Sequence, residues 1–326
     1  MIRLVRVELS RLLARRVVAL AVLASLAIGA VAVLGVFNQA RRIDQARSGF
    51  DATYQQIVEG HEENVRYCKI EEEAERQRTG DDVDFGCDQM TVPTVEEMYG
   101  AMPSLHDQFT MLFGTLAYPL MFLALAMGST AVAAEFAHRT MGSWLTFEPR
   151  RSLVFWSKVL APALAAIPVG VVGLVTVLIG VPAVFRWFRI DEGLSTQEWT
   201  SLGWMLLRIL ALVVAAGAFG AAAAFVLRHS GLVIGLMVGY LVLVEGMLSV
   251  VFPFLTRLTL GRNISAVVHD GTQWESWPQS CGGPGMPECV PVVHTLSLTH
   301  GILVLAAVVA TVAVLGWVRF VRSDVD

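Results

Sequence analysis

Residues 17–37 read VVALAVLASLAIGAVAVLGVF, a run of 21 residues without a charged side chain. A helix needs about 20 mainly apolar residues to cross a bilayer, whereas a helix of a soluble domain interrupts its apolar stripe with charge every turn. The other predominantly apolar stretches are residues 109–134, 153–185, 202–227, 231–255 and 298–318. With 55% hydrophobic and 16% charged residues, the pattern predicts an all-α polytopic membrane protein with six transmembrane helices.

The segments between these stretches are polar or amphipathic. At helical spacing Ile2, Val5 and Leu9 share one face and arginines cover much of the rest, so residues 1–16 are expected to form an amphipathic interfacial helix. No convincing small-residue cleavage site follows residue 37, which favours an uncleaved first span over a signal peptide. Residues 38–106 are rich in acidic and other polar side chains and predict a water-exposed, partly helical insert; residues 256–297 predict a second polar loop.

The distribution of basic residues predicts the orientation. The N-terminal segment, the 135–158 region, the 228 hairpin and the C-terminus carry 12 Lys and Arg residues, against four in the two shorter loops on the other side. The positive-inside rule then places both termini in the cytoplasm and the two large loops outside. Arginine far outnumbers lysine, and Ala, Val and Gly are abundant. This composition favours a bacterial plasma membrane.

The cysteines all fall in the two large loops predicted to lie outside: Cys68, Cys87, Cys281 and Cys289. An even number on the oxidising side of a membrane favours disulfides. Three connectivities are possible, and pairing within each loop, Cys68 with Cys87 and Cys281 with Cys289, keeps each loop self-contained. The alternative is a metal site using Cys281 and Cys289 with His269 or His294, but its spacing matches no common zinc pattern.

Catalytic motifs are missing from the sequence. It contains no G-x-x-x-x-G-K-[ST] phosphate loop, no H-E-x-x-H and no G-x-S-x-G. We therefore expect no enzyme activity and no cofactor in this chain, so any energy source must be another protein. A membrane-embedded enzyme would need converging polar groups, and His106, His269 and His294 are too scattered in the sequence to support one.

Residues 133–161, AAEFAHRTMGSWLTFEPRRSLVFWSKVLA, form the most informative polar segment. They resemble the cytoplasmic loop of ABC-2 type transporter permeases, in which an acidic residue, a histidine or glycine, a threonine, a leucine, a proline-arginine pair and a lysine recur at this spacing. The matching residues are Glu135, His138, Thr140, Leu145, Pro149, Arg150, Arg151 and Lys158. Arg139 departs from the glycine that usually precedes the threonine.

The resemblance implies a permease subunit of an ATP-driven ABC exporter. In that family this loop holds a coupling helix that docks on the ATPase. The residues expected to couple the chain to an ATPase are Glu135, His138, Arg139, Thr140, Trp144, Leu145, Pro149, Arg150 and Arg151. The implied partners are two ABC ATPase subunits that carry ATP and Mg, a second permease, identical or related, and the lipid bilayer, with no nucleic acid.

Other interpretations stay open at this point. Arg150, Arg151 and Lys158 could be ordinary positive-inside anchors at lipid headgroups. The chain could also be a membrane assembly or sensory protein that transports nothing and binds a partner through its disulfide-stabilised outer loops.

Two features lie inside the predicted spans. Arg208 and Glu245 are ionisable residues in apolar stretches that form a tight hairpin, and we expect them to form an ion pair; the alternative is that Glu245 lines a substrate or ion path. Gly231, Gly235 and Gly239 form a G-x-x-x-G-x-x-x-G face, which predicts close helix packing within the hairpin or across a dimer interface.

Overall fold

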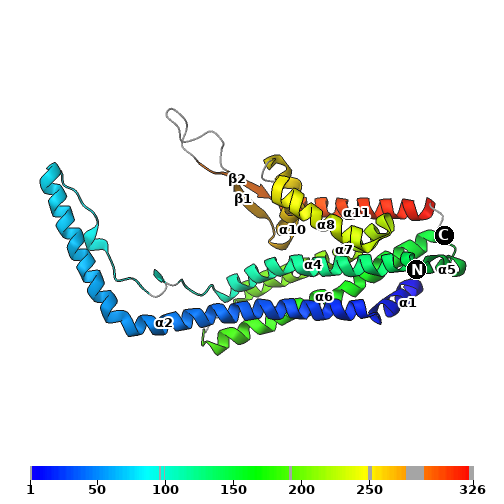
Figure 1. The fold of residues 1–326 in the computed structure, drawn as a ribbon, viewed down its shortest axis with the longest axis horizontal. Helices are drawn as coiled ribbons and strands as arrows, with labels where there is room; N and C mark the ends of the chain where they lie inside the picture. Colours follow the sequence, from blue (N-terminus) through cyan, green and yellow to red (C-terminus); the bar gives the residue numbers. More distant parts are fainter. Residues whose placement is uncertain are drawn as a thin grey trace. The chain divides into compact units, whose positions relative to one another are not determined.

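The computed structural model describes residues 2–94, 97–98, 100–190, 193–248, 252–276 and 290–322 and is predominantly helical. Within these ranges six helices are long and apolar enough to cross a membrane (Figure 1). They are α2 (Arg16–Thr79), α4 (Leu105–Ala137), α6 (Arg151–Trp187), α7 (Thr196–Leu227), α8 (Ser230–Tyr240) with its continuation to Leu248, and α11 (Leu298–Arg322). The predicted class, an all-α multi-pass membrane protein, is confirmed at this level.

The chain divides into two compact units. Unit 1 comprises Met1–Ala32, His106–Gly180 and Gly193–Asp326, and unit 2 comprises Val33–Leu105 and Val181–Glu192. Helix α2 contributes its first part to unit 1 and its remainder to unit 2, because the helix continues from the predicted first span into the polar insert without a break.

Helices α4 and α7 of unit 1 approach each other closely at glycines. A Cβ atom on Gly128 would lie 2.2 Å from the carbonyl oxygen of Gly217, and one on Gly220 would lie 2.1 Å from that of Leu125. The glycine face of α8, which was predicted to pack closely, shows no such approach. No heavy atom of the described chain lies within 4 Å of a Cβ on Gly235 or Gly239. Packing of that face within the hairpin is therefore not observed, and its packing across a subunit contact stays a prediction.

Replacing Gly220 with valine is expected to destabilise unit 1 by at least about 1–3 kcal/mol, because backbone atoms of α4 occupy the space of the new side chain and the two helices would have to separate. Gly235→Val is the matched control, since its side chain meets open space on the single chain. Thermal unfolding in detergent measures both variants. Equal stability of the two would contradict the α4–α7 contact.

Aromatic side chains join four helices near one end of unit 1. The ring of Phe225 in α7 lies 4.7 Å from that of Phe155 in α6 and 5.0 Å from that of Phe320 in α11, measured between centroids. Phe136 of α4 meets the same ring edge-on at 5.6 Å. Phe155, Phe225 and Phe320 are buried, so this cluster fixes the helix ends on which the candidate functional site is built.

The predicted fifth span and the following loop differ from the expectation of a helix over residues 231–255 and a polar loop over 256–297. The α-helix α8 changes at Leu241 into a π-helix, η2 (Leu241–Leu248), and a 3-10 helix, η3 (Pro253–Leu258), leads into α10 (Leu260–Val268). The short helix α10 buries Ile264, Val267 and Val268 and packs on α11 and α7. Strands β1 (Thr272–Ser276) and β2 (Val292–Leu296) then form an antiparallel pair.

Helix α1 (Ile2–Leu13) and α5 (Thr140–Phe147) complete the α-helices whose bounds the described residues give. Helix α1 lies in the segment predicted to form an interfacial helix, and α5 lies in the segment predicted to hold a coupling helix.

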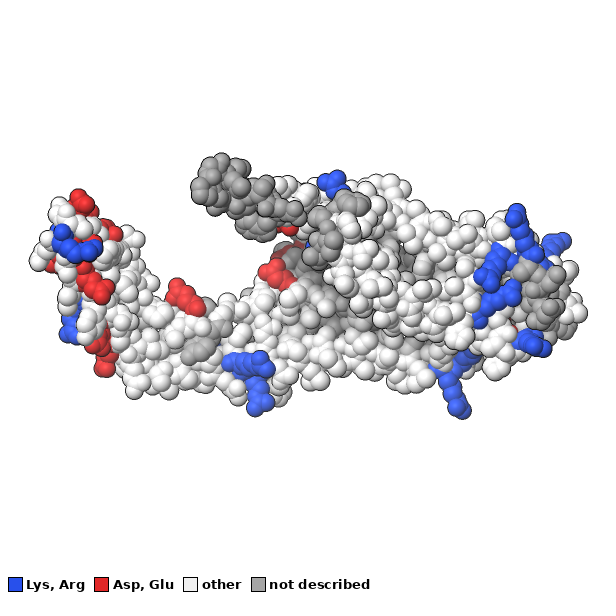
Figure 2. Space-filling view, turned by 45° about the horizontal axis from the view of Figure 1, so that its top comes forward, with Lys and Arg blue, Asp and Glu red and all other residues white. Residues whose placement is uncertain are grey.

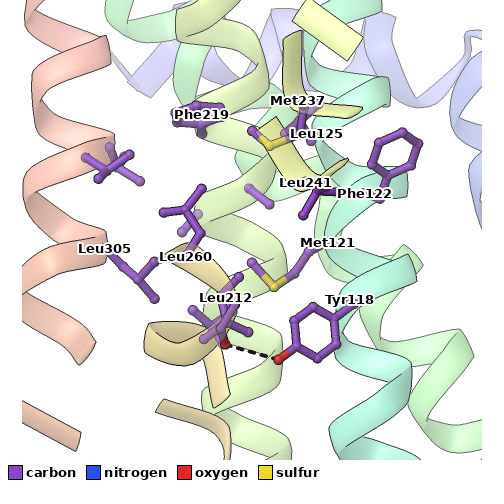
Figure 3. A pocket seen from close by; sticks show the side chains of 16 residues that line it. Tyr118, Met121, Phe122, Leu125, Leu212, Phe219, Met237, Leu241, Leu260 and Leu305 are labelled. Carbon is purple, nitrogen blue, oxygen red and sulfur yellow. Dashed lines mark hydrogen bonds between the residues drawn. The ribbon is translucent and has the colours of Figure 1, made fainter. Parts of the chain in front are cut away.

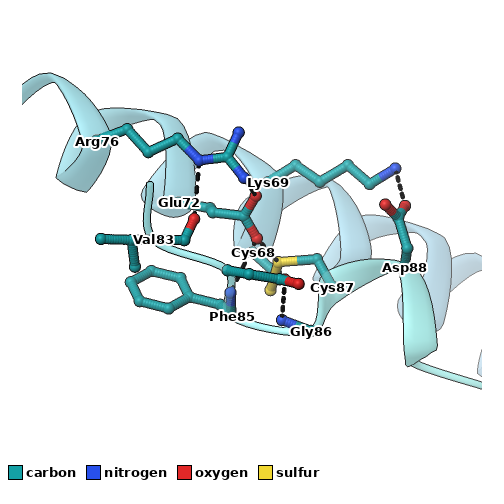
Figure 4. The surroundings of a disulfide bond; sticks show 10 residues. Cys68, Lys69, Glu72, Arg76, Val83, Phe85, Gly86, Cys87 and Asp88 are labelled. Atoms are coloured by element: carbon teal, nitrogen blue, oxygen red, sulfur yellow. Dashed lines mark hydrogen bonds and ion pairs between the residues drawn. A yellow bond between two sulfur atoms is a disulfide. The ribbon is translucent and has the colours of Figure 1, made fainter. Parts of the chain in front are cut away.

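Unit 2 holds a disulfide between Cys68 and Cys87, with Cα atoms 5.8 Å apart (Figure 4). The bond joins α2 to the 3-10 helix η1 (Cys87–Gln89) and confirms the first predicted pairing. The second, Cys281 with Cys289, lies outside the described residues, as does the alternative metal site that would use them. Elsewhere in the described chain, no three His, Cys, Asp or Glu side chains are grouped to hold a metal ion.

Polar bonds align the return segment beside the disulfide (Figure 4). Arg76 Nε donates to the carbonyl oxygen of Val83 at 2.8 Å, and the Phe85 N–H donates to Glu72 Oε2 at 3.0 Å. Lys69 Nζ lies 2.6 Å from Asp88 Oδ1, and its hydrogen bond and charge hold the pKa of the Asp88 carboxyl below its usual value. A carboxyl pKa below its usual value keeps this contact charged in mild acid, so reduction rather than mild acidification should open the segment.

Replacing Cys68 and Cys87 together with serine is expected to loosen the return segment selectively. The cysteines are 19 residues apart, and closing a loop of this length stabilises a fold by about 3 kcal/mol in the chain-entropy view. Limited proteolysis between residues 80 and 94 should become at least about tenfold faster, while cleavage in unit 1 stays unchanged. Unaltered protection of residues 80–94 would show that the polar bonds alone hold the segment.

Candidate functional site

The candidate site lies at the end of unit 1 that carries α1 and α5, here called the α1 end. Figure 2 shows Lys and Arg side chains gathered at this end, whereas the middle of the unit is almost free of charge. Four elements meet here: α1, the last turn of α4, α5 and the first turns of α6. The separation of charged and apolar surface is the one that a membrane imposes on the helices crossing it.

A buried lysine forms the centre of the site. Lys158 of α6 is 3% exposed, and its Nζ lies 2.9 Å from Glu8 Oε1 of α1 and also contacts Glu135 Oε2 of α4. Glu8 and Glu135 are likewise buried, at 7% and 6% exposure. Arg15 completes the group, since its guanidinium lies 3.3 Å from Glu135 Oε1 and donates to the carbonyl oxygen of Ala131 at 3.2 Å.

This group, Glu8, Arg15, Glu135 and Lys158, is called the charge cluster. Charges removed from water are costly unless they are paired and hydrogen-bonded. Here two carboxylates meet two cations, so the cluster is electrically balanced. The cavity beside it measures about 20 Å³, which is room for about one water molecule. The cluster therefore serves to join helices rather than to bind a ligand.

Trp144 attaches α5 to the charge cluster. Lys158 Nζ lies 4.7 Å from the centre of the Trp144 ring, and Arg11 Cζ lies 5.2 Å from it. A cation over an aromatic face is attracted by the ring quadrupole, more strongly where water is excluded. The indole thus contacts a cation of α6 and one of α1. Movement of α5 cannot leave Lys158 undisturbed.

The local backbone explains why α5 is short. Arg139 precedes it with φ of 54°, in the left-handed region, which separates α5 from α4. The Thr140 hydroxyl donates back to the carbonyl oxygen of Glu135 at 3.3 Å. At the other end Glu148 is extended and Pro149 follows, as expected for a residue that precedes a proline.

The predicted coupling residues separate into an inner and an outer group. Glu135 and Trp144 belong to the inner group, together with Arg151, which donates to the carbonyl oxygen of Val321 in α11 at 3.2 Å. The exposed, outer residues are His138, Arg139, Thr140, Pro149 and Arg150. The side chain of Leu145 lies outside the described residues. Because Glu135 is buried, it acts on its neighbouring helices and not on a partner surface.

Glu8 was not among the sequence-predicted site residues, and Lys158 was expected only as a member of the loop pattern. Two signals in the sequence point to them. Glu8 is the single acidic residue among the arginines of residues 1–16, and Lys158 is one of only two lysines in the chain. Neither signal indicates a partner, since 150 residues separate the two.

The predicted pair between Arg208 and Glu245 is wrong. Arg208 lies 3.0 Å from Asp270 Oδ2, just beyond the end of α10. Glu245 accepts at Oε1 from the Gly261 N–H at 2.7 Å and from the Tyr240 hydroxyl at 3.1 Å. The first N–H groups of a helix lack partners within it and attract negative charge. Helix α10, which was not predicted, therefore separates the expected pair. Its first turn binds Glu245, and Asp270 just beyond its last turn binds Arg208.

No protein-family model, curated protein or solved structure matches this chain. The function of the chain is therefore inferred from its own residues and their geometry. At the level of class, the chain is a multi-pass helical membrane protein.

Proposed function

We propose that this chain is the permease subunit of an ATP-driven ABC exporter and that α5 is its coupling helix. One observation carries the proposal: a short helix between two long apolar helices is tied on its inner side to a buried charge cluster and surrounded on its outer side by exposed polar residues. Such a helix can receive a push from a partner protein and pass it to α1, α4 and α6 together.

The geometry of the cluster supports a mechanical role. Lys158 contacts carboxylates from two other helices, so a displacement of Trp144 changes contacts to α1 and α4 at once. A packed group of this kind has few alternative arrangements, because interiors are dense and charges need partners. It would transmit movement as a switch between arrangements, which is the form that coupling between distant sites takes.

Arg139 supports the resemblance to ABC-2 type permeases in an unexpected way. The family pattern has a glycine at this place, and Arg139 adopts a φ of 54°. Glycine takes this conformation without strain, whereas other residues do so at some cost. The backbone here is thus the one that the glycine would serve, although the side chain differs.

The proposal also specifies the orientation of the chain in its membrane and its partner subunits. The α1 end, where Lys and Arg gather, faces the cytoplasm of a bacterial plasma membrane, with both termini on that side. Two separate ATPase subunits bind ATP and Mg and dock on the outer residues around α5, and a second permease, identical or related, completes the transporter. In this proposal ATP hydrolysis takes place on the ATPase subunits and not on the permease chain.

A second candidate function is a membrane assembly or sensory protein that does not transport. Unit 2 favours it, because its disulfide-stabilised segment exposes Tyr67, Ile70 and Phe85, at 55%, 57% and 50% of their surface. Exposed apolar side chains of this size on a polar segment indicate a surface that can bind a partner.

Affinity purification of the protein in mild detergent separates the two candidates. The permease proposal predicts co-purification of an ABC ATPase in about equal amount, with ATP hydrolysis that rises in the presence of a transported compound. Recovery of the protein only with partners that bind the outer loops, and without ATP hydrolysis, would favour the second candidate.

A further inference from the structure

An apolar cavity of about 150 Å³ lies where α4, α7, α8, α10 and α11 of unit 1 meet (Figure 3). Side chains from all these helices point toward it, among them Met121, Leu212, Phe219, Met237 and Leu260. A space of about this volume can hold a group the size of a benzene ring. The cavity is therefore suited to a short alkyl segment or a ring.

A polar chamber of about 470 Å³ adjoins the apolar cavity and shares Tyr118 and Gly261 with its wall. The Tyr118 hydroxyl donates to the Gly261 carbonyl oxygen at 3.2 Å and marks the boundary between the two spaces. The remaining wall of the chamber includes threonine and serine side chains and the side chain of Trp274. A molecule that occupied both spaces would need one apolar and one polar end.

Charge gives the polar chamber a sign. The carboxylates of Glu245 and Glu275 line it together with one guanidinium, that of Arg262. Arg262 also lies over the Trp274 ring, with Cζ 5.5 Å from its centre. Among the described residues, the chamber wall thus carries one more negative than positive side chain, and this charge complements a cationic group rather than an anionic one.

Glu245 belongs to an unusual element. It lies in the π-helix η2, and π-helical turns are rare and frequent at functional sites. An ionisable residue within an apolar span is also costly and marks a functional site by default. Its bonds to Gly261 and Tyr240 hold the carboxylate at the boundary of the two spaces, which is the position needed to meet a headgroup.

We propose that the apolar cavity and the polar chamber together bind a cationic amphiphile, with its apolar part among the side chains of Figure 3 and its positive headgroup beside Glu245. The inference names the substrate class and rests on the proposed function only in calling this molecule a substrate. Binding itself needs neither ATP nor a partner chain.

Photoactivatable probes test the site directly. Three alkyl diazirines that differ only in the headgroup, trimethylammonium, hydroxyl or sulfonate, are added to the purified protein in lipid nanodiscs, and labelled peptides are mapped by mass spectrometry. We expect labelling around Met121 and Phe219 to be at least about tenfold stronger with the trimethylammonium probe than with the sulfonate probe. Glu245→Gln should reduce that preference to less than about threefold.

Matched substitutions separate the site from the surrounding lipid. Ala215→Phe fills the apolar cavity, which Ala215 lines, and should abolish labelling by all three probes. Ala306→Phe makes the same change at an exposed position of α11 outside the cavity wall and should leave labelling unchanged. If Glu245→Gln fails to fold, Glu275→Gln provides the charge test. Glu275 is exposed, and replacing it leaves the bond between Glu245 and Gly261 of α10 intact.

Equal labelling by the three probes, or labelling that Ala215→Phe does not reduce, would overturn the proposal, since ordinary bilayer lipid would account for it. The assay contains no ATPase. Its failure therefore leaves the permease proposal intact, and failure of an ATPase to co-purify leaves the binding site intact.

Discussion

Replacing Lys158 with methionine is expected to lower the free energy of unfolding by about 3–5 kcal/mol, because Glu8 and Glu135 would remain buried without the cation that they share. Methionine keeps much of the lysine volume and fills gaps readily, so the loss reports on charge rather than on packing. Thermal and denaturant unfolding in nanodiscs measures it. A native stability of 5–15 kcal/mol, common among folded proteins, leaves such a variant barely folded.

The triple variant Glu8→Gln, Glu135→Gln and Lys158→Met is the control for this experiment. It removes the unpaired carboxylates, and buried ion pairs replaced as a whole by neutral side chains are often tolerated. Arg15 remains charged, but its side chain is 35% exposed and reaches water. Recovery of most of the stability is expected. A loss below about 1 kcal/mol for Lys158→Met alone would contradict a charge cluster that holds α1, α4 and α6 together.

Replacing Trp144 with alanine is expected to leave ATPase binding intact and to weaken the dependence of ATP hydrolysis on substrate by about 5- to 150-fold. This range corresponds to the 1–3 kcal/mol typical of coupling between sites. The reason is that Trp144 contacts Lys158 on the inner side of α5, whereas the exposed residues around α5 stay in place. ATP hydrolysis by the purified complex, measured with and without the transported compound, gives the ratio.

Trp156→Ala is the matched control, since it removes the same side chain from an exposed position on α6. It should change neither ATPase binding nor the response to substrate. Unchanged coupling in a correctly folded Trp144→Ala variant would mean that movement of α5 does not pass through the charge cluster.

The parts of the structure that were predicted correctly are those with a local signal. An uncharged run such as residues 17–37 specifies a span by itself, and Cys68 and Cys87 fall in the same predicted insert, which favoured their pairing over the two other connectivities. Helix α10 was missed because nine residues are too few for a clear period, and its apolar face has meaning only against α11.

Long-range polar contacts were the part that could not be predicted. Arg208 and Glu245 were expected to pair because their hairpin is tight, but Glu245 binds the first turn of α10 and Arg208 binds Asp270 just beyond its end. Lys158 and Glu8 pair across 150 residues, and only the packing of α1 against α6 brings them together. Hydropathy identifies charged residues within apolar segments, and such charges need partners when buried. It does not identify the partner of each charge.

The most direct test of the central claim compares ATPase co-purification for the protein and two charge-reversal variants. Arg150→Glu changes an exposed residue three positions beyond α5, and Arg3→Glu changes an exposed arginine of α1 at the same end of the unit. We predict that an ABC ATPase co-purifies with the unaltered protein and with Arg3→Glu and is lost with Arg150→Glu. Two results would contradict α5 as the coupling helix of a permease. One is equal binding of an ATPase to all three proteins, and the other is the absence of an ATPase from all three purifications.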